Sequence, residues 1–280
     1  MPELPEVETV RRGLTQLTLN QNITGGDVLL QRTIAYPFSV EEFIEKTKNS
    51  SIVSWHRRGK YLLAELSSSS WLGVHLRMTG QLLWLSRDEP VHKHTRVRLF
   101  FGEQQELRFV DQRTFGQMWY VPPGVPVESV ITGLAKLALD PFSPEFTVEY
   151  LANKLQKSRR PIKTALLDQS VVAGLGNIYA DEALFKSGIL PTTTSADLQK
   201  KQIEPLRTAI IDVLSASIAA GGTTFSNFLN VKGVNGNYGG EAWVYNRAGE
   251  PCKVCGNVIQ RIKLGGRSSH FCDHCQSYRE

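Results

Sequence analysis

The first residues of the chain combine a proline with carboxylates in a pattern that could do covalent chemistry. The sequence begins Met1-Pro2-Glu3-Leu4-Pro5-Glu6-Val7-Glu8-Thr9. Removal of Met1 would leave Pro2 with a secondary amine, and an α-amino group has a pKa of about 8, so part of it is an unprotonated nucleophile near neutral pH. Such an amine attacking a sugar carbon forms a charged iminium that withdraws electrons, and Glu3 is the adjacent acid or base. The alternative is a helix N-terminus with ordinary preferences for Pro and Glu.

All four cysteines lie near the end of the chain in two identical pairs. Their spacing is Cys252-x2-Cys255-x16-Cys272-x2-Cys275. This spacing predicts two knuckles that hold one Zn²⁺ through four thiolates in a tetrahedral arrangement. Because no coordination position stays open, we expect a structural zinc that takes no part in catalysis. Disulfides are the alternative, and a reducing compartment opposes them.

Two basic loop sequences are further candidates. Lys60 ends the run Arg57-Arg58-Gly59-Lys60 between two predicted strands, where its ammonium could approach a phosphate or a leaving oxygen. A solvated turn is the alternative. His92 and His94 flank Lys93, and period-two spacing places both imidazoles on one face. A metal pair would need a third ligand, and none is evident. We therefore expect phosphate contacts, with ordinary exposed histidines as the alternative.

Two further motifs contain side chains that could enter a base stack. They are His75-Leu76-Arg77-Met78-Thr79-Gly80 and Asp111-Gln112-Arg113-Thr114-Phe115-Gly116. A protein that extracts a base from a duplex must fill the vacated stack and satisfy the partner base. Met78 and Phe115 are suitable wedges, and Arg113 can donate two hydrogen bonds to an unpaired base. The alternative is that Met78 and Phe115 are core side chains on strands.

Length and composition indicate the elements that must position these residues. At 280 residues the chain exceeds the usual single core, so we expect two domains and a small additional one. Hydrophobic residues make up 41% and charged residues 21%, as in ordinary globular proteins. No apolar run reaches the roughly 20 residues that cross a bilayer, and no leader is evident, so we expect a cytoplasmic protein. The net charge of +5 and the pI of about 9.0 suit a polyanionic partner.

The N-terminal half combines two helices with a β-rich pattern. Apolar residues at helical spacing after Pro5 predict the first helix, and Ser39 and Glu42 have the spacing of a capping box that opens a second, short one. Strands are predicted at 51–57, 60–66, 71–79, 81–85, 95–101, 106–111 and 116–121. Many short strands at this spacing indicate an antiparallel sandwich or barrel. Prolines then place a domain boundary between about 134 and 146.

The following segment has helical periodicity. Helices are predicted around Val148–Leu155, from Pro161 to about Asp168, and along Ile203–Leu214, the last one ending at Gly221-Gly222. The glycine-rich stretch 221–240 is predicted to be a mobile loop, and a simple flexible connection is the alternative.

A glycine-containing turn in this half has features of an anion site. Gly174 and Gly176 would let the backbone approach an anion, and Asn177 would cap a helix whose first N–H groups point at phosphate. Basic residues gather just upstream: Lys157, Arg159, Arg160 and Lys163. They predict a stripe that follows a DNA backbone, with a solvated charged face as the alternative.

Taken in order, these motifs resemble the formamidopyrimidine-DNA glycosylase family of bacterial repair enzymes, over essentially the whole chain. The resemblance implies a multidomain α+β fold. Residues 1–133 would form an N-terminal antiparallel β-sandwich with flanking helices and 134–146 a linker. Residues 147–245 would form a helical domain with a helix–two-turn–helix element, and 246–280 a four-cysteine zinc-finger β-hairpin.

The resemblance also implies an activity. Family members remove 8-oxoguanine and formamidopyrimidines through an N-terminal proline Schiff base, then cleave the strand by β,δ-elimination as AP lyases. Roles in this chemistry would fall to Pro2, Glu3, Lys60 and Arg267. The void fillers would be Met78, Arg113 and Phe115, with Arg113 facing the orphaned cytosine. Backbone contacts would come from His94, Arg159, Lys163 and Asn177.

The partner implied is damaged double-stranded DNA, bound by a monomer in the cytoplasm at the nucleoid, with no membrane. Two other functions stay open at this stage. One is the related endonuclease VIII type of glycosylase, which applies the same amine chemistry to oxidised pyrimidines. The other is a non-catalytic damage-binding protein that keeps the scaffold.

Overall fold

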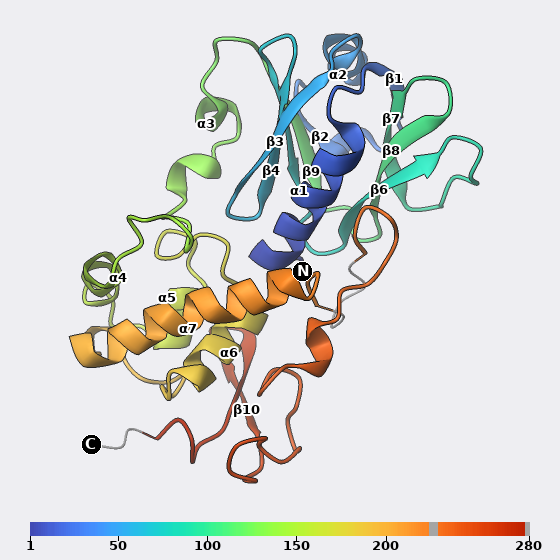
Figure 1. The fold of residues 1–280 in the computed structure, drawn as a ribbon. Coiled ribbons are helices and arrows are strands. Elements are labelled where there is room, and N and C mark those ends of the chain that lie inside the picture. Colours follow the sequence, from blue (N-terminus) through green and yellow to red (C-terminus); the bar gives the residue numbers. More distant parts are fainter. Residues whose placement is uncertain (224–228, 278–280) are drawn as a thin grey trace. The chain divides into compact units, whose positions relative to one another are not determined.

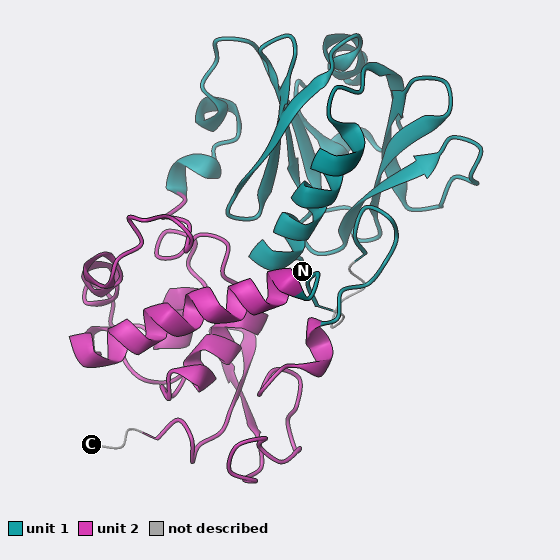
Figure 2. Ribbon diagram, viewed as in Figure 1, with its two compact units in different colours: residues 1–136, 220–237 teal, residues 137–219, 238–280 magenta. Residues whose placement is uncertain are grey.

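The computed structural model describes residues 1–223 and 229–277, which form two compact units (Figures 1 and 2). Unit 1 contains residues 1–136 and 220–237, and unit 2 contains residues 137–219 and 238–280. The segment 220–237 thus belongs to the first unit, although it follows the helical segment in sequence. Part of the predicted mobile loop, residues 224–228, lies outside the described residues. The predicted domain boundaries and the mobility of this loop stay predictions.

Unit 1 begins with helix α1 (Leu4–Thr18), where the sequence predicted a helix. Its apolar residues recur at helical spacing, and Val7, Val10 and Leu14 are fully buried. At its start the Glu6 carboxylate accepts a hydrogen bond of 2.8 Å from the Glu3 amide. This bond satisfies one of the donors that a helix N-terminus leaves open, so it holds the chain start against the helix.

Two sheets form the rest of the core of unit 1. Their orders are β1-β7-β8-β6 and β2-β9-β5-β4-β3, in which β2 and β9 pair in parallel and the other neighbouring strands pair antiparallel. The strands are β1 (Ile23–Val28), β2 (Ile34–Tyr36), β3 (Ile52–Arg58), β4 (Tyr61–Leu66), β5 (Trp71–His75), β6 (Gly80–Ser86), β7 (Thr95–Phe101), β8 (Gln105–Asp111) and β9 (Gln117–Val121). Buried side chains from both sheets and from α1 share one apolar cluster. The antiparallel sandwich with flanking helices is therefore confirmed.

The differences from the predicted strands have local causes. Strands β1 and β2 were not predicted, because β1 contains Gly25 and Gly26 and β2 has only three residues. The strand expected over 71–79 ends at His75, because the chain then crosses from one sheet to the other.

Short helices complete unit 1. Helix α2 (Val40–Thr47) begins after Ser39, whose hydroxyl accepts from the Glu42 amide as the capping pattern predicted. Helix α3 and two 3₁₀ turns lie elsewhere in the unit: α3 (Val127–Val130), η1 (Gln31–Thr33) and η2 (Leu134–Lys136).

Unit 2 consists of helices and one hairpin. Its elements are α4 (Val148–Leu155), α5 (Ile162–Leu166), α6 (Asn177–Lys186), η3 (Ser195–Asp197), α7 (Lys200–Ala219), η4 (Tyr238–Gly240), β10 (Gln260–Leu264) and β11 (Arg267–Phe271). Helix α7 ends just before Gly221 and Gly222, both with positive φ, as the C-terminal glycine signal predicted. Among the described residues, no helix combines the length and apolar character needed to cross a membrane.

One local prediction in unit 2 is wrong. The N-cap of α6 is Gly176, and Asn177 is the first helical residue. The Asn177 side chain donates instead to the Ser268 carbonyl at 3.0 Å, which joins the start of α6 to the hairpin.

Candidate functional site

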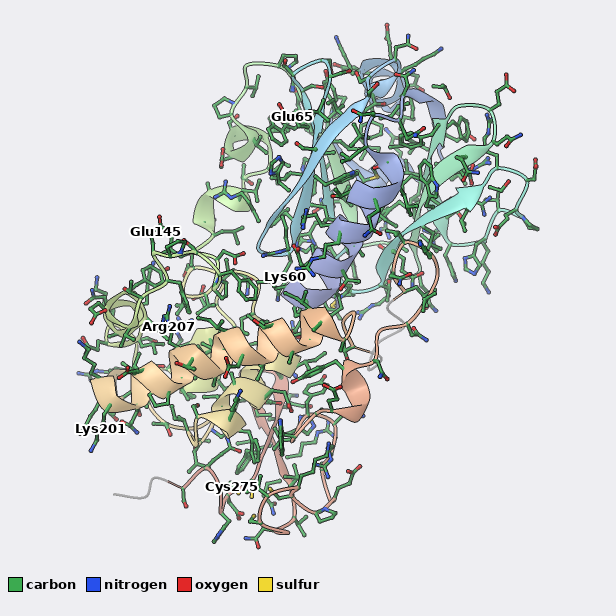
Figure 3. The ribbon with its side chains drawn as sticks, viewed as in Figure 1. Lys60, Glu65, Glu145, Lys201, Arg207 and Cys275 are labelled. Carbon is green, nitrogen blue, oxygen red and sulfur yellow. The ribbon has the colours of Figure 1, made fainter. Side chains whose placement is uncertain are left out.

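The start of the chain lies in a buried and charged part of unit 1. Pro2 and Glu3 are buried, and Lys60 is only 6% exposed, directly after Gly59 in the β3–β4 turn (Figure 3). Burial lowers the pKa of the chain-terminal amine, which Met1 carries in the full sequence. The positive charges of Lys60 and Arg113 lower this pKa further, and the carboxylates of Glu3 and Glu6 oppose the shift. The surroundings therefore favour an unprotonated amine.

The predicted wedge residues lie on two neighbouring loops of unit 1. Residues 76–79 connect β5 to β6, and residues 112–116 connect β8 to β9. Both loops cross between the two sheets, and the strands at their ends pair with each other, with His75 opposite Gln117 and Gly80 opposite Asp111. Two motifs that are distant in sequence therefore lie side by side.

The exposure of these side chains differs from that of core residues. Phe115 is 53% exposed, and the Arg113 guanidinium carbon lies 5.2 Å from the centre of its ring. Met78 is half-buried. Phe115 is therefore not the core side chain of the alternative interpretation, and an exposed aromatic ring beside an arginine suits contact with nucleic-acid bases.

The loop with His92 and His94 lies on the same unit. The ring centres of these histidines are 5.3 Å apart, and the His94 carbonyl accepts from the Asp111 amide at 2.9 Å. Desolvation and the neighbouring Lys93 and Arg96 lower the pKa of His94. Within the described residues no third ligand joins these histidines in a metal cluster. Contact with phosphate stays a prediction.

In unit 2, Arg267 and Asn177 line one surface cavity of about 540 Å³. Other polar side chains of its lining come from the hairpin and from the segment before the cysteines: Arg261, Ser268, His270, Tyr245 and Asn246. Arg159, which precedes α5 in the sequence, is also exposed. Two arginines and several hydrogen-bond donors on one concave surface suit an anionic ligand such as a phosphate backbone.

The prediction that Lys163 contacts DNA is wrong for this structure. Lys163 is 0% exposed, and its ammonium forms a buried ion pair with Asp181 and donates to the Asn177 carbonyl at 2.8 Å. The other oxygen of Asp181 accepts from the backbone amide of His270 at 3.0 Å and lies 3.1 Å from its Nδ1. Lys163 therefore links α5 to α6, and Asp181 continues the link from α6 to strand β11 in the interior of the unit.

Sequence reasoning missed several of these buried polar residues. Asp181 and His270 received no role, and Glu6 and Asp111 were quoted within motifs without a function. Each forms hydrogen bonds to residues far away in the sequence. For Asp111 the local signal is an acidic residue at the end of a buried strand.

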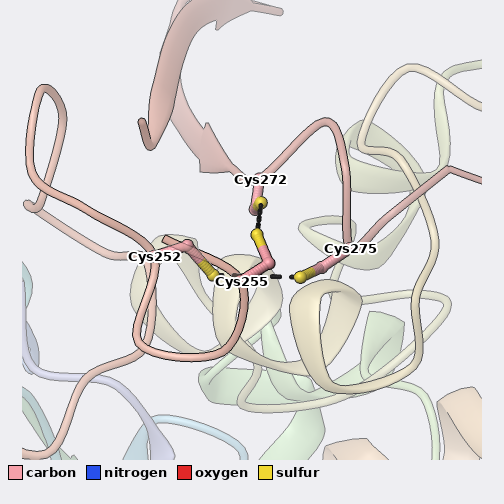
Figure 4. Close-up of side chains that lie close together, drawn as sticks. All are labelled: Cys252, Cys255, Cys272 and Cys275. Carbon is pink, nitrogen blue, oxygen red and sulfur yellow. Dashed lines mark hydrogen bonds between the residues drawn. The ribbon is translucent and has the colours of Figure 1, made fainter. Parts of the chain in front are cut away.

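The four cysteines converge on one point (Figure 4). Their sulfur atoms all lie within 4.8 Å of one another, with separations of 3.8 Å between Cys252 and Cys275 and 3.4 Å between Cys255 and Cys272. Four thiolates bound to zinc at about 2.3 Å would lie about 3.8 Å apart. The residues therefore fit one tetrahedral structural zinc ion, and buried Phe185, Val244 and Ile259 pack around it.

Comparison with known proteins decides the family. Residues 1–118 match the model of the formamidopyrimidine-DNA glycosylase N-terminal domain, and residues 137–228 match its H2TH domain. Residues 249–277 match a zinc finger found in FPG and IleRS. A formamidopyrimidine-DNA glycosylase of Nostoc punctiforme is 81% identical and covers 100% of this chain and 97% of its own length.

The chain belongs to the formamidopyrimidine-DNA glycosylase family. A relative from another Nostoc species is 80% identical over 99% of this chain and 100% of its own. The Lactococcus lactis Fpg, solved in complex with DNA containing an abasic site, superposes with a TM-score of 0.90 at 35% identity, covering 99% of this chain and 100% of that one. The Thermus thermophilus MutM (FPG) protein gives a TM-score of 0.88 at 34% identity, covering 100% of both chains.

Membership makes the chain a DNA glycosylase of DNA repair with a structural zinc finger. For a formamidopyrimidine-DNA glycosylase, the buried chain start, the two wedge loops and the arginine-lined cavity are the three features that need a mechanistic role.

Proposed function

We propose that this glycosylase excises oxidised purines, 8-oxoguanine and formamidopyrimidines, and then cleaves the strand as an AP lyase. The observation that carries the proposal is the environment of the chain start, where Pro2, Glu3 and Lys60 are buried. Burial lowers the pKa of the terminal amine that Met1 carries, and the charges of Lys60 and Arg113 lower it further against the opposing carboxylates of Glu3 and Glu6. An enzyme amine must be unprotonated to act as a nucleophile, and such surroundings raise its reactive fraction.

In the proposed reaction, removal of Met1 leaves Pro2 as the nucleophile. Its nitrogen bonds to the sugar C1′ while the bond from C1′ to the damaged base breaks. Glu3 transfers the proton needed for opening of the sugar ring, which leaves an iminium between Pro2 and C1′. The iminium acidifies the C2′ hydrogen. Loss of this proton expels the 3′ phosphate by β-elimination, and a second elimination expels the 5′ phosphate.

The remaining predicted residues bind and position the DNA. Lys60 and Arg267 hold the phosphates next to the lesion and assist proton transfer, and His94, Arg159 and Asn177 contact the backbone. Met78, Arg113 and Phe115 fill the space of the extruded base. In support, the Lactococcus lactis relative was solved with DNA containing an abasic site, and a single-residue mutant of that relative with DNA containing Fapy-dG. We propose that this chain binds damaged duplex DNA in the same way, as a monomer.

An intact-mass measurement combined with borohydride trapping tests the nucleophile. We expect protein lacking Met1 to form a covalent adduct with abasic DNA when borohydride reduces the iminium. Pro2→Gly should lower lyase activity while leaving DNA affinity within about threefold, because affinity depends mainly on phosphate contacts. The exposed Pro123 provides a matched control, and Pro123→Gly should behave as the unchanged protein.

Two results would contradict the proposal. Active protein that retains Met1 and still nicks damaged duplex would require another nucleophile. Correctly processed protein that yields no adduct would favour a damage-binding protein. The lesion class needs a separate competition, in which preferential excision of dihydrothymine over 8-oxoguanine opposite cytosine would indicate the endonuclease VIII type of activity.

A further inference from the structure

The carboxylate of Asp111 is buried between the two wedge loops. Asp111 is 1% exposed and is the last residue of β8. Its Oδ1 accepts from the hydroxyl of Thr79 on the first loop and from the Arg113 amide on the second loop at 3.2 Å. Its Oδ2 accepts from the Gly116 amide at 2.7 Å. One side chain therefore receives hydrogen bonds from both loops.

Thr79 closes this network. Its hydroxyl oxygen also accepts from the Arg113 amide, at 2.9 Å, while the hydroxyl hydrogen points to Asp111. Thr79 directly follows Met78, and the Arg113 and Gly116 amides enclose Thr114 and Phe115. The hydrogen bonds are thus made by Arg113 itself and by the residues that directly follow Met78 and Phe115.

The loop backbones are strained and tightly packed at these positions. Arg77 precedes Met78 with a φ of 54°, and Thr114 separates Arg113 from Phe115 with a φ of 58°. Residues with a side chain seldom adopt this left-handed conformation without support from their surroundings. A Cβ added at Gly116 would lie 2.3 Å from the Phe109 ring and 3.1 Å from Asp111 Oδ2, so the second loop packs against the Phe109 ring more closely than a residue with a side chain would allow.

We propose that Asp111 is the positioning residue that holds the two wedge loops in one arrangement, which rests on the proposed role of Met78, Arg113 and Phe115 in filling the vacated stack. Asp111 touches neither DNA nor the reacting atoms in this role. It keeps the Met78 loop and the Arg113–Phe115 loop in register, so that the wedge and the donor for the partner base enter the duplex together. Its carboxylate couples base extraction to recognition of the opposite base.

The test separates base extraction from the chemistry that follows it. Asp111→Asn keeps the shape of the side chain but replaces one carboxylate oxygen with an NH2 group. This group would face the Thr79 hydroxyl or a backbone N–H, which are themselves hydrogen-bond donors. We expect kcat/KM for excision of 8-oxoguanine opposite cytosine to fall at least 30-fold and the preference for cytosine over adenine opposite the lesion to shrink. Borohydride trapping on a single-stranded abasic oligonucleotide, which has no stack to fill, should change less than threefold. The exposed Asp88 provides the control, and Asp88→Asn should change neither reaction.

A second pair of variants serves if Asp111→Asn does not fold. Thr79→Val removes the hydroxyl while keeping the shape, and Thr79→Ser keeps the hydroxyl. We expect Thr79→Val to lower duplex excision about tenfold and Thr79→Ser to stay near the unchanged protein, both with normal single-strand trapping. Equal losses on duplex and single strand, or no loss on the duplex, would overturn the proposal.

Direct wedge variants distinguish this inference from the proposed function. If Arg113→Ala and Phe115→Ala retain full excision activity, the proposed stack-filling role is wrong, and the proposed role of Asp111 is wrong too. If they lose excision while Asp111→Asn and Thr79→Val do not, the stack-filling role stands and only the role of Asp111 is wrong.

Discussion

The carboxylate of Glu6 accepts a hydrogen bond from the backbone amide of Thr223, although the two residues lie 217 positions apart in sequence. The N–O distance is 2.9 Å, and the second carboxylate oxygen accepts from the Glu3 amide at 2.8 Å. Glu6 is 0% exposed. One buried side chain thus ties the chain start to the residue that directly precedes segment 224–228.

Replacement of Glu6 tests this link. Glu6→Gln would set an amide donor against one of the two backbone N–H groups, and an unsatisfied buried donor costs about 1–3 kcal/mol. We expect a loss of unfolding free energy in this range, measured by urea denaturation, together with slower excision. The exposed Glu45 provides the control, and Glu45→Gln should stay within about 0.5 kcal/mol. Equal stability of the two variants would contradict the structural role of Glu6.

His75 should make the stability of the protein depend on pH. It is buried, and its Nδ1 accepts from the Arg77 amide at 3.0 Å, so this nitrogen carries no proton. Burial, then the charges of Arg77 and Lys60, lower the pKa of His75 to about 3. Above the ordinary pKa of about 6.5 the imidazole is neutral in both states, and no stability is lost.

As the pH falls from about 6.5 towards 3, the unfolded chain binds a proton that the folded chain does not. His75 should therefore lower the unfolding free energy by at most about 1.4 kcal/mol for each pH unit in that window. Urea unfolding between pH 7.5 and 4.5 measures the slope. His75→Gln should flatten it, whereas His56→Gln, at an exposed position, should not. An unchanged slope in His75→Gln would show that the acid sensitivity arises elsewhere.

The zinc site should stabilise the finger and support DNA binding without taking part in the chemistry. Cys255→Ser removes one of four thiolates, and we expect loss of zinc by metal analysis and at least tenfold weaker binding to duplex DNA. The exposed His274 lies between two ligands in sequence, and His274→Gln should retain a full equivalent of zinc. Unchanged DNA affinity after zinc loss would show that the finger is dispensable for binding.

The buried pair of Lys163 and Asp181 should act as one unit with His270. Lys163→Met would leave the Asp181 carboxylate without its ammonium partner, and breaking a buried pair costs about 3–5 kcal/mol. Adding Asp181→Asn removes the uncompensated charge, so the double variant should be less destabilised than the sum of the single ones. Thermal unfolding of the four proteins measures this coupling. Additive losses would mean that the two residues do not interact energetically.

Much of the local structure could be predicted because its causes are local. The apolar spacing after Pro5 defines the buried face of α1, and Ser39 caps α2 through a residue three positions away. The strands with strong β formers were found, whereas β1 with its two glycines was not. The spacing of the short strands predicted a sandwich or barrel, and the spacing of the cysteines predicted the zinc site. The fold and the family matches confirm the sandwich and the zinc finger.

The sequence by itself determined the zinc ligands, the Pro-Glu start and the wedge motifs, because each depends on residue types at short spacings. Only the tertiary structure decided which polar residues are buried and what they bind. Lys163 appears in the sequence as one member of a basic run, and the fold places it in the interior against Asp181. Asp111 similarly becomes the partner of Thr79 because strands β6 and β8 pair there. Desolvation and long-range hydrogen bonding depend on the folded surroundings, and a linear pattern does not contain them.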